Sequence, residues 1–177
     1  CRALAAEERP ACTDRLRARS RMARPLAEGR AAVLASNWPE AVAKLEAALA
    51  IADGEPDVLA ELGWARFRAG QWCAATQDTE ALDAERESPS DGGAPSPVAV
   101  LCTRQVSPHQ AVEELELAAG AAPSVELRAT WEHQRAQVSA ALGEEADAWE
   151  AARRSLCARE DAMVREDAAA MLWRTAN

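Results

Sequence analysis

Few side chains in this sequence have the types and spacing that catalysis or metal binding requires. The two histidines, His109 and His133, stand 24 residues apart. A zinc site would need two or three further converging donors, so we interpret both as surface polar residues. The sequence also contains no nucleophile elbow, no phosphate-binding glycine loop and no metalloprotease helix motif.

The paired carboxylates give no catalytic signal either. Glu113–Glu114 and Glu144–Glu145 fit helix surfaces or helix starts, where acidic side chains favour the helix dipole. Acid–base catalysis would need a pocket that brings such groups together, and the sequence indicates none. We therefore expect a non-enzymatic protein without metal or cofactor, and an enzyme is the remote alternative.

Cysteine is the third residue type whose side chain could be reactive. Apart from the first residue, the chain has Cys12, Cys73, Cys102 and Cys157. An even number suits an oxidising compartment, but four cysteines allow three pairings, and the sequence alone does not choose among them. Buried free thiols that act as small apolar residues are an equal alternative.

The chain begins with Cys1, so it was either processed or cut from a longer protein. A mature N-terminal Cys resembles a bacterial lipoprotein. This resemblance implies lipid attachment at Cys1 and a place on the periplasmic face of the cell envelope, with Arg2 favouring the outer membrane. A cytoplasmic location is the alternative. No apolar run approaches the roughly 20 residues that span a bilayer, so we expect membrane contact only through such an anchor.

Composition favours helices. The chain has 177 residues, is 49% hydrophobic with much Ala, and contains six Trp but no Tyr; Ala-rich sequence with little Val and Ile forms helices more readily than strands. The net charge is −9, although residues 1–30 are rich in Arg. An acidic body argues against a nucleic-acid partner, because phosphates require clustered cations.

Two stretches of the chain share one spaced pattern. A small residue is followed by an aromatic, an Ala and an aliphatic residue, and the pattern recurs 34 residues later. The first copy consists of Gly29, Trp38, Ala41 and Ala48, and the second of Gly63, Trp72, Ala75 and Leu82. This period is typical of helix–turn–helix repeats, in which each unit buries its apolar face against its neighbour.

The best-formed copy, residues 61–72, closely resembles the core of a tetratricopeptide repeat (TPR). The resemblance implies an all-α protein, a right-handed α-solenoid of antiparallel helix pairs. In such a fold Gly29 and Gly63 would lie at close helix crossings, Gly70 would end one helix and Trp72 would begin the next.

We expect a single TPR-like domain over residues 1–177. Clear repeats occupy 22–87, a Ser-, Pro- and Gly-rich loop occupies 88–97, degenerate repeats occupy 98–160, and a capping helix over 161–177 closes the stack. Within the degenerate part, one helix over about 98–105 would precede a second helix that carries Ala111, Leu115, Ala118 and Pro123, and a further pair would span 125–142 and 146–157.

The first helix of each TPR unit lines a concave groove, so the resemblance assigns groove positions. These are Leu26, Arg30 and Val33 from the first repeat, Ala60, Trp64, Phe67 and Arg68 from the second, and Val100, Thr103 and Arg104 from the third. Trp64 and Phe67 share one helix face, and the three arginines would rim this aromatic patch. The alternative is that Trp64 or Phe67 packs within the chain itself.

The resemblance implies a protein-binding adaptor or scaffold that holds a peptide or a partner helix in this groove. The arginines around the aromatic patch predict an acidic or amphipathic partner, and the lipoprotein resemblance at Cys1 implies a bacterial protein. The family's Lys and Asn clamp for a peptide carboxylate is not reproduced. A structural module of a longer protein, with no ligand of its own, is the alternative function. In a regular stack Cys73 and Cys102 would lie on neighbouring helices, which makes them a candidate disulfide.

Overall fold

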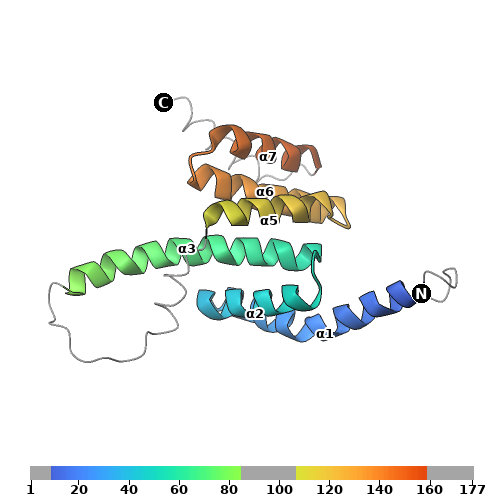
Figure 1. Ribbon diagram of the computed structural model, residues 1–177. Coiled ribbons are helices and arrows are strands. Elements are labelled where there is room, and N and C mark those ends of the chain that lie inside the picture. Colours follow the sequence, from blue (N-terminus) through green and yellow to red (C-terminus); the bar gives the residue numbers. More distant parts are fainter. Residues whose placement is uncertain (1–8, 85–106, 159–177) are drawn as a thin grey trace.

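The computed structural model describes residues 9–84 and 107–158, with side chains described for 10–75 and 107–158. Every described element is a helix, which confirms the all-α prediction. The helices are α1 (Arg9–Leu34), α2 (Trp38–Ile51), α3 (Pro56–Ala84), α5 (Pro108–Gly120), α6 (Val125–Ala141) and α7 (Glu145–Ala158). Each helix packs against the next described one along the chain (Figure 1).

Local signals explain where most helices begin and end. Pro39 lies in the first turn of α2, where no backbone donor is needed. The Ser124 hydroxyl caps α6 by accepting a hydrogen bond of 3.2 Å from the Leu127 amide. Gly54 and Gly143 have φ values of 71° and 77°, in the left-handed region that glycine adopts without strain. The predicted boundary between the helices over 125–142 and 146–157 is confirmed by the end of α6 and the start of α7.

The apolar core follows the order of the helices. One cluster joins α1, α2 and α3 through residues such as Leu26, Leu45 and Leu62. The next joins α3, α5 and α6 through residues that include Leu115 and Trp131, and a third, small cluster joins α6 and α7 through Ala side chains. Burying a leucine side chain contributes about 1.5–3 kcal/mol, so each helix is stabilised mainly by its neighbours.

The predicted helix break at Gly70 and Trp72 is wrong, because α3 runs unbroken for 29 residues. A glycine inside a helix costs only about 1 kcal/mol relative to alanine. The residues that follow it, Gln71 to Ala75, include good helix formers and no proline. Nothing in the local sequence therefore opposes continuation of the helix.

Gly29 and Gly63 lie at close helix crossings, as predicted. A β-carbon on Gly29 would lie 2.8 Å from Leu45 Cγ in α2. A β-carbon on Gly63 would lie 3.0 Å from the Ala111 carbonyl oxygen in α5. The neighbour of Gly63 is thus α5, and not the segment after Trp72 that the 34-residue period assigned to it.

Several predictions concern residues outside the described ranges. They are the loop over 88–97, the helix over about 98–105 with Val100, Thr103 and Arg104, the capping helix over 161–177, and the roles of Cys1 and Cys102. Among the described helices, none is long and apolar enough to cross a membrane.

Candidate functional site

An arginine lies over two tryptophan rings where α2 meets α3. The Arg68 guanidinium carbon is 5.6 Å from the centroid of the Trp38 ring and 5.9 Å from that of Trp64. The Trp64 and Phe67 rings are 5.7 Å apart, tilted by 43°. Such distances allow cation–π and aromatic attraction. We call Trp38, Trp64, Phe67 and Arg68 the aromatic–arginine cluster.

The exposure of this cluster is uneven. Arg68 is exposed and Trp64 is half-buried, but Phe67 keeps only 7% of its surface and packs in the core with Leu115 and Trp131. The prediction that Phe67 lines an open groove is therefore wrong, because its ring is covered by α5 and α6. Trp64 packs against the same core, so Arg68 and one part of Trp64 supply the accessible surface.

The other predicted groove residues lie beside α3. Arg30 is exposed, and its Nε donates a hydrogen bond of 3.0 Å to Glu61, which ties α1 to α3. Val33 is half-buried against the first core cluster, and Leu26 is buried within it. Arg30 is thus accessible, whereas Leu26 stabilises the fold. Ala60 is 2% exposed and belongs to the core.

A buried ionic cluster joins α2, α3 and α5. Arg66 in α3 makes ion pairs with Glu46, at 2.9 Å, and with Glu114. Gln110 approaches the same Glu114 oxygen at 3.4 Å. Burial raises the pKa of Glu114 to about 7, because loss of hydration outweighs the opposing attraction of Arg66.

The prediction that Glu114 lies on a helix surface is wrong. Its position between Ala111 and Ala118, beside Leu115, puts it on the buried stripe of α5. That spacing could have identified the burial from sequence. The partner Arg66 could not have been identified, since it comes from a helix that the repeat period did not pair with α5.

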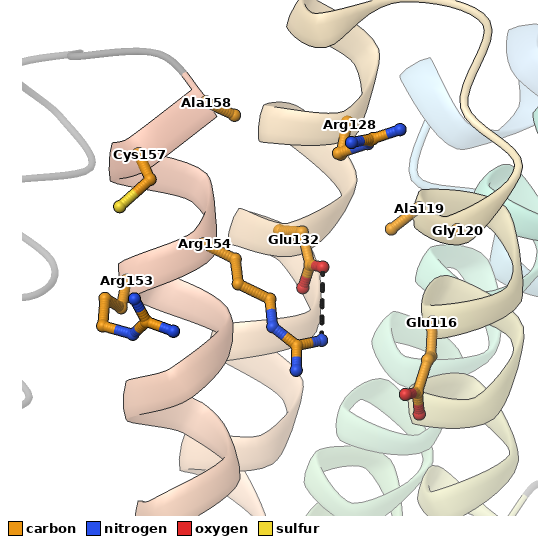
Figure 2. Close-up of a pocket in the computed structure, with 9 residues that line it drawn as sticks. All are labelled: Glu116, Ala119, Gly120, Arg128, Glu132, Arg153, Arg154, Cys157 and Ala158. Atoms are coloured by element: carbon orange, nitrogen blue, oxygen red, sulfur yellow. Dashed lines mark ion pairs between the residues drawn. The ribbon is translucent and has the colours of Figure 1, made fainter.

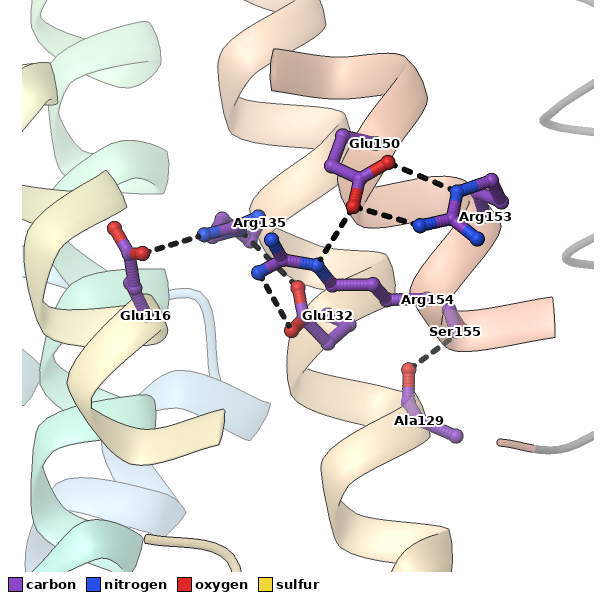
Figure 3. Close-up of polar contacts among 8 residues, drawn as sticks. All are labelled: Glu116, Ala129, Glu132, Arg135, Glu150, Arg153, Arg154 and Ser155. Carbon is purple, nitrogen blue, oxygen red and sulfur yellow. Dashed lines mark hydrogen bonds and ion pairs between the residues drawn. The ribbon is translucent and has the colours of Figure 1, made fainter. Parts of the chain in front are cut away.

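A second ionic network joins α5, α6 and α7 (Figure 3). Arg135, with 7% of its side chain exposed, lies 3.2 Å from Glu116 and 3.2 Å from Glu132. Arg154 lies 3.8 Å from Glu132, and both Arg153 and Arg154 donate to Glu150. Burial raises the pKa of Glu132. The sequence reading identified none of these residues.

A cavity of about 530 Å³ opens beside this network, between α5, α6 and α7. Figure 2 shows that three arginines and a cysteine are among the residues that line it. Its lining is Glu116, Ala119, Gly120, Arg128, Glu132, Arg153, Arg154, Cys157 and Ala158. We call it the α7 cavity. A cavity of similar volume lies between the first half of α1 and the α2–α3 turn, with Asp14, Arg15 and Glu55 in its lining.

Neither histidine is among the residues that line the two cavities. His109 is exposed, and its Nδ1 is 3.1 Å from Glu144. His133 is buried, with Nε2 3.1 Å from the Gln137 amide nitrogen, which corrects its predicted surface position. In the described parts of the chain, no three His, Cys, Asp or Glu side chains converge in a way that could hold a metal ion.

The described cysteines are of two kinds. Cys12 and Cys73 are disulfide-bonded, so for these two the alternative of free thiols is wrong. Cys157 is free and exposed. Because Cys102 lies outside the described residues, its pairing with Cys73 stays a prediction.

Comparisons with protein-family models, curated proteins and solved structures found no match to this chain.

Proposed function

We propose that the chain is a non-enzymatic adaptor or scaffold of TPR-like helix pairs, which binds an acidic or amphipathic segment of a partner protein. The bacterial envelope, with a lipid at Cys1, is the location that we propose for it. The proposal rests on the packing of the helices and on the aromatic–arginine cluster.

The helix packing supports a stack of antiparallel pairs: α1 with α2, α3 with α5, and α6 with α7. Small residues stand at corresponding places in the first two pairs, with Gly29 against Leu45 and Gly63 against Ala111 and Leu115. In α6 the fully buried Ala136 stands twelve residues before Ala148 of α7, the spacing that separates Gly29 from Ala41. Stacked pairs of this kind present extended binding surfaces.

On this interpretation, α5 is the second helix of the second pair. Ala111, Leu115 and Ala118 repeat the spacing of Ala41, Leu45 and Ala48, and all six are fully buried. The residues after Gly70 are then an insertion between the two helices of one pair. This replaces the assignment of α5 to a third repeat.

The observation that carries the proposal is the exposed Arg68 above two indole rings. Arginine and tryptophan are the residues that most often dominate the energy of protein interfaces. Arg68 makes a hydrogen bond of 3.0 Å with Gln71, but it has no carboxylate partner among the described residues, so it can receive one from another chain. The acidic body would repel an acidic segment elsewhere and help to direct it to this position.

Arg68→Ala should weaken the binding of an acidic amphipathic helical peptide roughly tenfold, because it removes both the charge and its contact with the indoles. Trp64→Ala should weaken it by roughly 2 kcal/mol. The measurement is a fluorescence titration of the full chain with synthetic peptides at two salt concentrations, and the effect of Arg68→Ala should shrink at high salt.

The matched control is Arg24→Ala, an exposed arginine of α1 paired only with Glu28 among the described residues. It should leave the affinity unchanged. A counterpart peptide in which Lys replaces Glu should bind weakly. Equal affinities of the wild type, Arg68→Ala and Trp64→Ala would contradict the proposal. A protein that binds neither peptide would instead favour a structural module without a ligand of its own.

A further inference from the structure

The α7 cavity combines a free thiol with an excess of positive charge. Cys157, Arg153 and Arg154 come from the end of α7, and Arg128 comes from the start of α6 on the other side of the opening (Figure 2). We propose that Cys157 is a modification site, which forms a mixed disulfide with an acidic low-molecular-weight disulfide such as oxidised glutathione. Its location and chemistry are separate from the aromatic–arginine cluster.

Of the three arginines that line the cavity, Arg128 has no ion-pair partner among the described residues. The ionic network assigns a partner to each of its acidic members: Glu116 and Glu132 contact Arg135, and Glu150 holds Arg153 and Arg154. Arg128 is exposed and makes no ion pair with any described residue. In a chain of net charge −9, this opening is a local site of attraction for a carboxylate.

The cavity is also bordered by a buried carboxylate that is already paired: Glu132 Oε2 lies 3.2 Å from Arg135 Nε. This pairing leaves Arg128 available for an incoming carboxylate. The cavity volume, about 530 Å³, lies within the range of small-molecule sites. A short peptide that carries carboxylates matches both this volume and the unpaired charge of Arg128.

The reaction is a thiol–disulfide exchange, and it needs no oxidant other than the disulfide itself. The thiolate of Cys157 attacks one sulfur of the small disulfide and forms a new S–S bond. The original S–S bond breaks, and its other half leaves as a thiolate that takes up a proton. The arginines act by holding the carboxylates of the incoming disulfide, which raises its concentration beside the Cys157 sulfur.

The test compares two small disulfides of opposite charge on the native full chain, with its own disulfides intact. Oxidised glutathione is anionic and cystamine is cationic. Both rates are measured by intact mass and divided by the rates for an unstructured peptide that contains one Cys, which removes the intrinsic reactivity of each reagent. We expect a normalised preference for glutathione of roughly tenfold, falling at high salt, with the adduct mapped to Cys157.

Three variants assign the preference to the cavity. Cys157→Ser should abolish the adduct, and Arg128→Gln should remove most of the preference. Arg153→Gln should remove less of it, because Glu150 already pairs with Arg153. Arg21→Gln, the same charge change at an exposed position of α1, should preserve it. Circular dichroism checks that each variant is folded. Equal normalised rates for the two reagents, or a preference that survives in Arg128→Gln, would overturn the proposal, and neither outcome bears on peptide binding at Arg68.

Discussion

Gly63→Ala is expected to lower the free energy of unfolding by about 1–3 kcal/mol, whereas Gly70→Ala in the same helix should raise it by about 0.5–1 kcal/mol. An added methyl at Gly63 would lie 3.0 Å from the Ala111 carbonyl oxygen and 3.3 Å from Leu115 Cγ. Leu115 is fully buried and the carbonyl belongs to the backbone of α5, so a packed segment of α5 has to yield by a few tenths of an ångström.

Gly70 provides the matched control, because among the described residues no atom outside its chain neighbours and the nearby backbone of its own helix lies within 4 Å of the position that its β-carbon would take. Alanine there only removes conformational freedom from the unfolded chain. Urea unfolding of the two variants and the wild type measures the sign of the change in the free energy of unfolding for each variant. Unchanged m-values test two-state behaviour. Gly63→Leu should destabilise more than Gly63→Ala.

The two signs distinguish the observed fold from the one that the repeat period predicted. If Gly70 ended a helix in the left-handed conformation, alanine would be strained there and Gly70→Ala would be destabilising. If α5 did not contact Gly63, Gly63→Ala would stabilise α3 as Gly70→Ala does. Two variants with the same sign would therefore contradict the packing of α5 on α3.

The sequence predicted those features that local chemistry decides. Gly143 acts within one turn of the chain, and the boundary between the helices predicted over 125–142 and 146–157 lies beside it. The close approaches at Gly29 and Gly63 were also readable, because a small residue at a fixed place in a helix pair admits the neighbouring backbone.

The predictions that were wrong concern which helices pack against each other. The period assigned the helix after Gly70 as the partner of Gly63, but α5 takes that position across the intervening residues 85–107. Bringing two distant parts of a chain together costs little more entropy when more residues intervene, since the cost grows only with the logarithm of their number. Good packing of Leu115 and Ala111 can therefore outweigh a long connection, and spacing along the chain does not reveal it.

For the candidate sites too, the sequence predicted some individual residues but not the arrangement that depends on helix packing. Trp64 and Arg68 were identified from the family's groove positions, whereas the buried position of Phe67 depends on α5 and α6. The α7 cavity was missed, because Arg128 and Cys157 are 29 residues apart and meet only through the packing of three helices. Isolated arginines on predicted helix surfaces carry no sequence signal of this arrangement.

Raising the pH from about 5 to about 8 should destabilise the protein through Glu114 by up to about 3 kcal/mol. The pKa of this carboxyl is about 7 in the folded chain, against an ordinary value of 4.5. Between these two values the folded state binds more protons than the unfolded state, so stability falls as pH rises. The raised pKa of Glu132 acts in the same direction.

Other carboxylates act in a lower pH range. Ion pairs with Lys44 and Arg24 lower the pKa of Glu28 to about 2, and pairs with Arg153 and Arg154 do the same for Glu150. Their contribution is present above the ordinary pKa and is lost as the pH falls below it. They therefore do not hide the loss of stability that Glu114 causes between about pH 5 and pH 8.

Glu114→Gln isolates the effect, because glutamine has nearly the same shape and its amide oxygen can still accept from Arg66. The variant should lose most of the pH dependence, so that its stability relative to the wild type increases from about pH 5 to about pH 8. Glu113→Gln, which removes the same charge from an exposed neighbour on α5, should keep most of the wild type's pH dependence, because Glu113 is only the smallest of the charges that raise the pKa of Glu114. Urea unfolding across this range measures all three proteins. A Glu114→Gln curve parallel to that of the wild type would show that Arg66 compensates the buried carboxylate fully, and that the junction of α2, α3 and α5 holds its charges without a cost to stability.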